Sequence, residues 1–204
     1  MKVASEPRRR GRPRSIDSEQ LLDDAMHIYW REGISELSLN EVCRRLNTPK
    51  PVVYREYGGE DGLKAACLDR YWNLHMNRLH IFLATAEGTF ADQIDALVDI
   101  ISGDVAGMKT AAGCLSVKMR SGRQGLGPLA HARVEQLERD NLKSYRRWLR
   151  RAEAARVLSA EADLTMLARY VDAQIVSAFD QKARGAAPKD IRFNASLALS
   201  VLLR

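Results

Sequence analysis

Apolar side chains recur at intervals of three and four along most of this 204-residue chain. That interval is the period of amphipathic α-helices, whereas runs of alternating Val, Ile and Thr, which would indicate strands, are almost absent. The pattern predicts an all-α protein of about nine helices. Hydrophobic residues make up 46% of the sequence, which is enough for a substantial core. The length fits a small domain followed by a medium-sized one.

The first predicted helix begins at a capping box formed by Asp17 and Gln20 and ends at Gly33. Between these limits the apolar positions follow helical spacing: Leu22, Ala25, Met26 and Tyr29.

Two short helices are predicted between Ser38 and Tyr57. We expect Ser38 and Glu41 to form a reciprocal capping box at the start of the first. Its apolar face consists of Leu39, Val42, Cys43 and Leu46. Asn47 tolerates the left-handed backbone that a reversal needs, and Thr48 and Pro49 would supply the N-cap and the first position of the next helix.

The second of these helices is predicted to have a buried and an outward face. Val53 and Tyr57, one turn apart, would pack inward. The outward positions would be Thr48, Lys50, Val52, Tyr54 and Arg55. Such a helix pair fits a DNA major groove. An ordinary helical hairpin inside a core is the alternative.

Residues 1–14 form a strongly basic segment that precedes the first helix. They contain six Lys and Arg residues against one Glu, and residues 8–14 read RRRGRPR. Gly11 and Pro13 exclude a regular helix, so we expect a flexible arm in which Arg12 and Arg14 lie along a DNA minor groove. A solvated tail that aids solubility is the alternative.

Residues 21–63, LLDDAMHIYWREGISELSLNEVCRRLNTPKPVVYREYGGEDGL, resemble the N-terminal domain of TetR-family transcriptional regulators. The resemblance rests on the apolar pair, Ala and aromatic residue of the first helix, its closing glycine, Ser38, and the Tyr54–Tyr57 end of the third helix. It implies that Ser38 and Tyr54 bind phosphates, while the first turn of the third helix contacts bases. The implied base contacts come from Thr48, Lys50 and Val52, and Pro49 is counted with them among the DNA-binding residues.

Two departures from the family pattern stand in this segment. Asn47 replaces the glycine that is usual in the turn, and Glu60 with Asp61 replaces a lysine that often contacts the DNA backbone. We expect the two acids to stabilise the positive N-terminus of the fourth helix.

The remaining helices are predicted at 60–86, 89–101, 128–155, 160–184 and 188–204, with short helices in the glycine-rich region 102–127. The predicted organisation is a flexible basic arm at 1–14, a helix-turn-helix DNA-binding domain at 15–59, and an effector-binding and dimerisation domain at 60–204.

The last two helices each carry a long apolar stripe. The family resemblance implies that they join the same helices of a second copy in a four-helix dimer interface. The residues expected in that interface are Leu164, Leu167, Val171, Ile175, Phe179, Ile191, Ala198, Val201 and Leu202. Burial against the protein's own earlier helices is the alternative. A dimer would contact a near-palindromic operator.

The resemblance also implies a small-molecule cavity among the middle helices, in which a ligand shifts the fourth helix and so changes the spacing of the two recognition helices. The residues chosen for its lining are apolar or amphipathic: Trp72, Met76, His80, Met108, Cys114, Met119 and Tyr145. Each of them also fits plain core packing. The sequence does not identify the effector.

The sequence predicts neither a metal site nor a cofactor. The three cysteines are far apart without CxxC spacing, and the four histidines form no metal-binding pair. A redox role for Cys114 is a minor alternative to packing. We find no P-loop, nucleophile elbow or carboxylate pair, so an enzyme is not expected.

No apolar stretch is long enough to span a bilayer and no signal peptide is evident, so we expect a cytoplasmic, nucleoid-associated protein without membrane contact.

The sequence thus favours a ligand-responsive regulator that binds a near-palindromic operator as a homodimer, most often a repressor in this family. Its partners would be double-stranded DNA, a second copy and an unknown small molecule. An effector-independent architectural DNA-binding protein and an enzyme with a dispersed site are the alternatives. A basic run on the predicted 128–155 helix is interpreted as a solvated face: Lys143, Arg146, Arg147, Arg150 and Arg151.

Overall fold

The computed structural model describes residues 18–34, 37–103 and 113–203, and within these ranges it contains helices and no strand. The α-helices are α1 (Ser18–Glu32), α2 (Leu39–Arg45), α3 (Lys50–Tyr57), α4 (Glu60–Tyr71), α5 (Asn77–Thr85), α6 (Phe90–Ser102), α7 (Leu115–Ser121), α8 (Pro128–Ala154), α9 (Leu164–Ala183) and α10 (Pro188–Leu199). Short 3₁₀ helices follow α7 at Arg123–Gly125 and α10 at Ser200–Leu203. The predicted all-α class is confirmed.

A π-helical segment, Trp72–Met76, joins α4 to α5 and makes the two one continuous helix. Counted in this way, the described part of the chain has nine α-helices, and the predicted helix at 60–86 is present. The π segment itself was not predicted. Such single wide turns inside α-helices occur often at functional sites.

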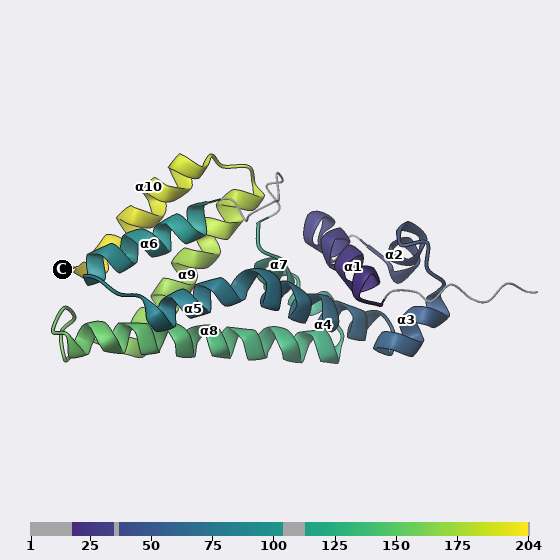
Figure 1. The fold of residues 1–204 in the computed structure, drawn as a ribbon, viewed down its shortest axis with the longest axis horizontal. Coiled ribbons are helices and arrows are strands. Elements are labelled where there is room, and N and C mark those ends of the chain that lie inside the picture. Colours follow the sequence, from purple (N-terminus) through teal and green to yellow (C-terminus); the bar gives the residue numbers. More distant parts are fainter. Residues whose placement is uncertain (1–17, 35–36, 104–112, 204) are drawn as a thin grey trace, which may run out of the picture.

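The molecule is elongated, with α1, α2 and α3 at one end and α6 and α10 toward the other (Figure 1). The long helix α8 runs beside α4 and α5 and so connects the two ends. α9 packs against α8, and α10 packs against both α6 and α9. One continuous cluster of buried side chains extends through all these contacts, so the ends share a core.

Capping residues explain where two of the later helices begin. Thr89 and Asp92 form a complete capping box at the start of α6, as the predicted start at Thr89 requires. α9 begins four residues later than predicted, because the Asp163 carboxylate accepts hydrogen bonds from the amides of Thr165 and Met166.

Several polar contacts hold α1 against the rest of the molecule. Arg70 on α4 donates two hydrogen bonds to Asp23, at 2.7 and 2.9 Å, and these bonds lower the pKa of that carboxyl. The Trp30 indole donates to the Gly113 carbonyl at 3.0 Å. The Lys118 ammonium donates to the carbonyl of Trp30 at 2.6 Å, close to the negative C-terminal end of α1. A displacement of α4 or α7 would therefore shift α1 as well.

Glu60 and Asp61 both lie in the first turn of α4, as expected, and Asp61 has a second role that was not predicted. Its carboxylate accepts hydrogen bonds from the amides of Leu129 and Ala130 at 2.8 and 3.0 Å, and thereby satisfies donors in the first turn of α8. Glu60 forms an ion pair with Lys64 at 2.8 Å within α4. Asp61 thus fastens the start of α4 to the start of α8.

Most of the apolar stripe predicted as a dimer interface is buried in the chain's own core. This agrees with the alternative, burial against the protein's own earlier helices. Five of the nine residues are at most 7% exposed: Val171, Ile175, Phe179, Ile191 and Leu202. Leu164, Leu167 and Ala198 are half-buried, and Val201 is 46% exposed. The prediction is wrong for the five buried residues, because they pack against neighbouring helices of the same chain and cannot reach a second copy.

Candidate nucleic-acid interface

Ser38 caps α2, but only half of the expected capping box is present. Its hydroxyl accepts a hydrogen bond from the Glu41 amide at 3.3 Å. The Glu41 carboxylate instead accepts hydrogen bonds from Arg44 and Arg45, which lower its pKa to about 2. Two nearby guanidinium groups compete more strongly for a carboxylate than one backbone amide does.

The turn between α2 and α3 depends on Asn47, whose φ of 47° lies in the left-handed region as predicted. The expectation that Thr48 caps α3 and faces outward is wrong. Pro49 is the N-cap of α3, and Thr48 is only 8% exposed, with its hydroxyl donating to the Leu46 carbonyl at 3.1 Å. Thr48 therefore fixes the turn from inside and does not face outward.

The outer face of α3 is polar, basic and aromatic. Lys50 is exposed, and Tyr54 is 57% exposed. Arg55 is also exposed but forms an ion pair with Glu56 at 2.8 Å. Val52 is half-buried, while Val53 is fully buried, as predicted. The exposed face contains hydrogen-bond donors and an aromatic ring suited to phosphates and base edges.

Three contacts fix the C-terminal end of α3. Gly58 and Gly59 have φ values of 75° and 123°, so the chain turns sharply into α4. The Tyr54 ring lies over Gly59, where an added Cβ would approach it to 3.2 Å. The Tyr57 hydroxyl donates to the Ser18 carbonyl at 3.1 Å, which ties α3 to the start of α1. The exposed face of α3 is thus held on a rigid support.

Arg44 is a candidate that the sequence analysis missed. Its side chain is 71% exposed at the end of α2, next to the turn. The adjacent arginines 44 and 45 are visible in the sequence as a basic pair at the end of this helix. Arg12 and Arg14 lie outside the described residues, so the predicted arm has no structural counterpart to compare.

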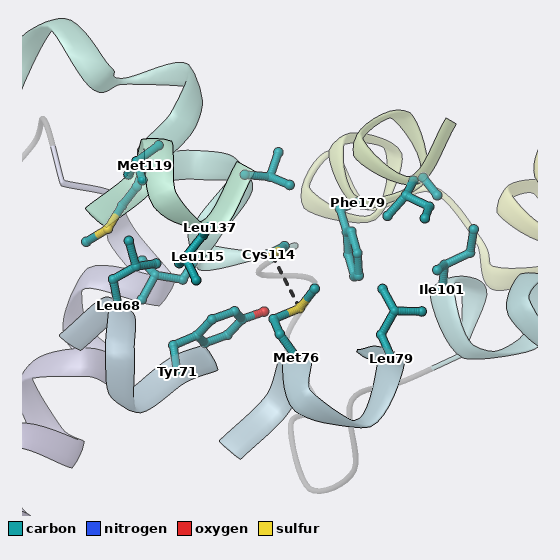
Figure 2. Close-up of a cluster of buried hydrophobic side chains, with 14 of the residues drawn as sticks. Leu68, Tyr71, Met76, Leu79, Ile101, Cys114, Leu115, Met119, Leu137 and Phe179 are labelled. Carbon is teal, nitrogen blue, oxygen red and sulfur yellow. Dashed lines mark hydrogen bonds between the residues drawn. The ribbon is translucent and has the colours of Figure 1, made fainter. Parts of the chain in front are cut away.

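A cleft of 740 Å³ lies between α5, α6 and α9. Four of its lining residues, Met76, Leu79, Ile101 and Phe179, point toward one another in Figure 2. A second, enclosed cavity of only about 20 Å³ lies deeper, between α7, α8 and α9. Of these two, the first is large enough for an organic ligand. A more open hollow of 580 Å³ lies between α4 and α8.

The residues predicted for an effector pocket are divided between these cavities and the core. Met76 lines both cavities, and Cys114 and Tyr145 line only the small one. Trp72, His80 and Met119 line neither. Met108 lies outside the described residues.

The unplaced pocket candidates have ordinary packing roles. The His80 ring contacts Ser144 and Asn141 at 2.8 and 2.9 Å, and it packs against Trp72 with ring centroids 4.7 Å apart. Met119 is fully buried. Periodicity predicted that these positions face inward, but it does not distinguish a cavity wall from a filled core.

Cys114 has the properties of a packing residue. It is 1% exposed, its Sγ lies 3.9 Å from the Met76 sulfur, and burial raises the pKa of the thiol. Thiolate formation is thereby suppressed.

The described residues contain no group of three or more His, Cys, Asp or Glu side chains that could hold a metal ion. None of the described helices is long and apolar enough to cross a membrane.

Comparison with known proteins finds transcriptional repressors. The chain is 30% identical over 112 residues to the HTH-type transcriptional repressor ComR of Escherichia coli K12, covering 53% of this chain and 51% of ComR. It is 26% identical over 101 residues to the repressor NemR of the same organism, covering 50% and 51%. The chain spans about half the length of these curated relatives. No family model matches it.

The likeness of the fold is broader. The crystal structure of reduced E. coli NemR covers 91% of this chain and 96% of NemR, with a TM-score of 0.74 and 19% identity. A CifR cysteine mutant complexed with a 26-bp operator covers 92% and 98%, with a TM-score of 0.76 and 19% identity. The TetR regulator of Rhodobacter sphaeroides covers 90% and 97%, with a TM-score of 0.75 and 16% identity.

The chain has the fold of the TetR family of transcriptional regulators, and the resemblance stated from residues 21–63 is confirmed. The relatives found by sequence are named as repressors, not as enzymes.

Proposed function

We propose that this protein is a DNA-binding transcriptional regulator, a repressor in its basic action, that binds a near-palindromic operator as a homodimer and is released by a small molecule. The observation that carries the proposal is the exposed face of α3, supported rigidly at one end of a TetR-type fold. A structural relative with the same fold, CifR, is described in complex with operator DNA.

Each exposed group has a definite part in this proposal. Lys50, in the first turn of α3, donates to a guanine edge, and Pro49 and Val52 provide apolar contact with thymine methyl groups. Ser38, Tyr54 and Arg55 donate to phosphates and set the register. The arm carrying Arg12 and Arg14 adds affinity from a minor groove. The division of the chain at residues 59 and 60 separates this unit from the regulatory part.

The proposed dimer uses the two last helices, as the sequence predicted, but through their exposed side chains, of which only Val201 belongs to the predicted set. Phe193, Leu197 and Val201 lie on one side of α10 and the 3₁₀ turn after it and are 67%, 62% and 46% exposed; Met166 on α9 is 56% exposed. Exposed apolar groups gathered in this way are typical of an interaction surface. A second copy, placing the same face against this one, would bury them in an isologous interface.

Release follows from the way α4 connects the parts of the molecule. Arg70 of α4 binds α1, and Asp61 of α4 binds the first turn of α8. A ligand that displaces α5 would move α4, which is continuous with it, and so would move α1 and α3. The distance between the two recognition helices of a dimer would then no longer match successive major grooves.

Selection of genomic DNA fragments tests the proposal, with wild-type protein compared to Lys50→Ala. Wild-type protein is expected to retain a few discrete fragments that share a palindrome. Lys50→Ala should bind these fragments about 10- to 100-fold more weakly, because a base contact contributes roughly 1–3 kcal/mol. Lys143→Ala, which removes the same charge from a 66% exposed position on α8, is the matched control and should retain wild-type affinity.

The architectural alternative gives a different result in the same experiment. Such a protein would retain fragments from throughout the genome, and the Lys50 and Lys143 variants would behave alike. That result would remove sequence-specific regulation from the proposal.

A further inference from the structure

The cleft between α5, α6 and α9 has an apolar interior with apolar groups left exposed along it. Leu74, Ile81 and Ile100 line the cleft and are 46%, 55% and 40% exposed. Its lining also includes the buried side chains of Met76 and Phe179. The volume of 740 Å³ lies within the range of small-molecule sites. A ligand with a hydrocarbon or aromatic body would remove these side chains from water.

The charges around the cleft are unequal. Arg78 lines it and has no ion pair or hydrogen bond in the described part of the chain. Asp99, the acidic lining residue, is engaged by Arg192 of α10. The Lys182 ammonium, on an 8% exposed side chain, donates to the carbonyl of the lining residue Gly103 and lies 5.7 Å from the Phe179 ring centroid. Arg78 is thus a lining cation without a partner in the described part of the chain, and the acid beside it is neutralised, which favours an anionic ligand.

We propose that this cleft binds an amphipathic carboxylate, with its apolar body against Leu74, Ile81 and Ile100 and its carboxylate paired with Arg78. The regulatory part of this inference rests on the proposed function, since the ligand would be the effector that releases DNA. A guanidinium binds a carboxylate through two parallel hydrogen bonds and therefore selects it over a neutral or cationic head group.

The same cleft contacts the side chains that connect α4 with α1. Tyr71 and His75 line it, and both pack on Trp30 of α1, with ring centroids 4.7 and 4.8 Å apart. His75 lies in the π segment, where the helix already departs from regular hydrogen bonding. Burial, together with the neighbouring His27, lowers the pKa of His75 and so disfavours a charge on this ring. A ligand that displaces Tyr71 or His75 would therefore also displace Trp30 of α1, on which both rings pack.

Calorimetric titration of the full-length protein with three ten-carbon probes tests the inference: decanoate, decanol and decylamine. Decanoate is expected to bind about tenfold more tightly than decanol, as one charge-assisted pair provides, and decylamine more weakly than both. The Arg78→Gln variant should lose this preference and bind decanoate and decanol alike. Arg78→Lys keeps the charge and should retain part of the preference. Arg146→Gln, which neutralises an exposed arginine on α8, should behave as wild type.

Three results would overturn the inference: no binding of decanoate, equal affinity for all three probes, or an unchanged preference in Arg78→Gln. If Arg78→Gln does not fold, the Ile81→Gln variant provides the test. It should lower the affinity for decanoate and for decanol equally, because both probes place the same apolar body against Ile81. A parallel assay of operator release by decanoate separates the two proposals. Decanoate binding without DNA binding would support the ligand assigned to the cleft and contradict the proposed function. DNA binding without decanoate binding would support the proposed function and contradict the assigned ligand.

Discussion

Replacing Gly62 by alanine is expected to destabilise the protein and to weaken operator binding. Gly62 lies in the first turn of α4, and an added Cβ would stand 1.7 Å from the carbonyl oxygen of Tyr57, the last residue of α3. That oxygen belongs to the backbone and cannot rotate away, so α3 must move relative to α4. We expect the free energy of unfolding to fall by about 3 kcal/mol and the operator affinity to fall more than about tenfold.

Chemical denaturation and DNA titration of the variant measure the two effects. Gly125→Ala is the matched control, because its added Cβ would meet nothing within 4 Å. That control should change the free energy of unfolding by less than about 0.5 kcal/mol. Wild-type stability and wild-type affinity in Gly62→Ala would show that α3 is not held by this close approach.

Introducing two glutamates on α10, by Phe193→Glu with Leu197→Glu, is expected to convert the protein to a monomer. Both side chains are more than 60% exposed, so the chain's own core loses little. In a two-fold interface each glutamate would face apolar groups and its symmetry-related copies, and desolvating these charges is costly. Since a monomer holds one half-site, operator affinity should fall by about a hundredfold or more.

Sedimentation velocity gives the oligomeric state, and DNA titration gives the affinity. Val157→Glu places the same charge on a 44% exposed apolar residue just after α8, outside the proposed interface, and should remain dimeric. A double variant that is still dimeric would place the interface elsewhere. A wild-type protein that is monomeric at micromolar concentration would contradict the proposed homodimer.

The helices could be predicted from the sequence because their signals are local. Gly33 ends α1 with a φ of 87°, Asn47 adopts the left-handed backbone, and Pro128 opens α8, each for reasons contained in a few neighbouring residues. The outward position of Tyr54 and the burial of Val53 follow from the same short-range periodicity. These features fixed the position of the candidate interface.

The errors concern which partner a side chain meets across the fold. The stripe containing Val171, Ile175 and Phe179 was correctly identified as apolar, but periodicity does not tell burial within the chain from burial in a dimer. Asp61 lies in the first turn of α4 as expected, but its bonds to α8, 68 residues later in the sequence, were not predicted. Thr48 is drawn inward by the Leu46 carbonyl. Such contacts are set by tertiary packing, which local spacing does not encode.

Hydroxyl-radical footprinting of a selected genomic fragment is the most direct test of the central claim, that two copies of α3 contact DNA together. The account predicts two protected patches related by two-fold symmetry, with centres about 34 to 36 Å apart, one helical turn or a multiple of it. Lys50→Ala should weaken both patches equally. A single protected patch, or uniform protection along the fragment, would contradict a paired scaffold that presents the recognition helix twice.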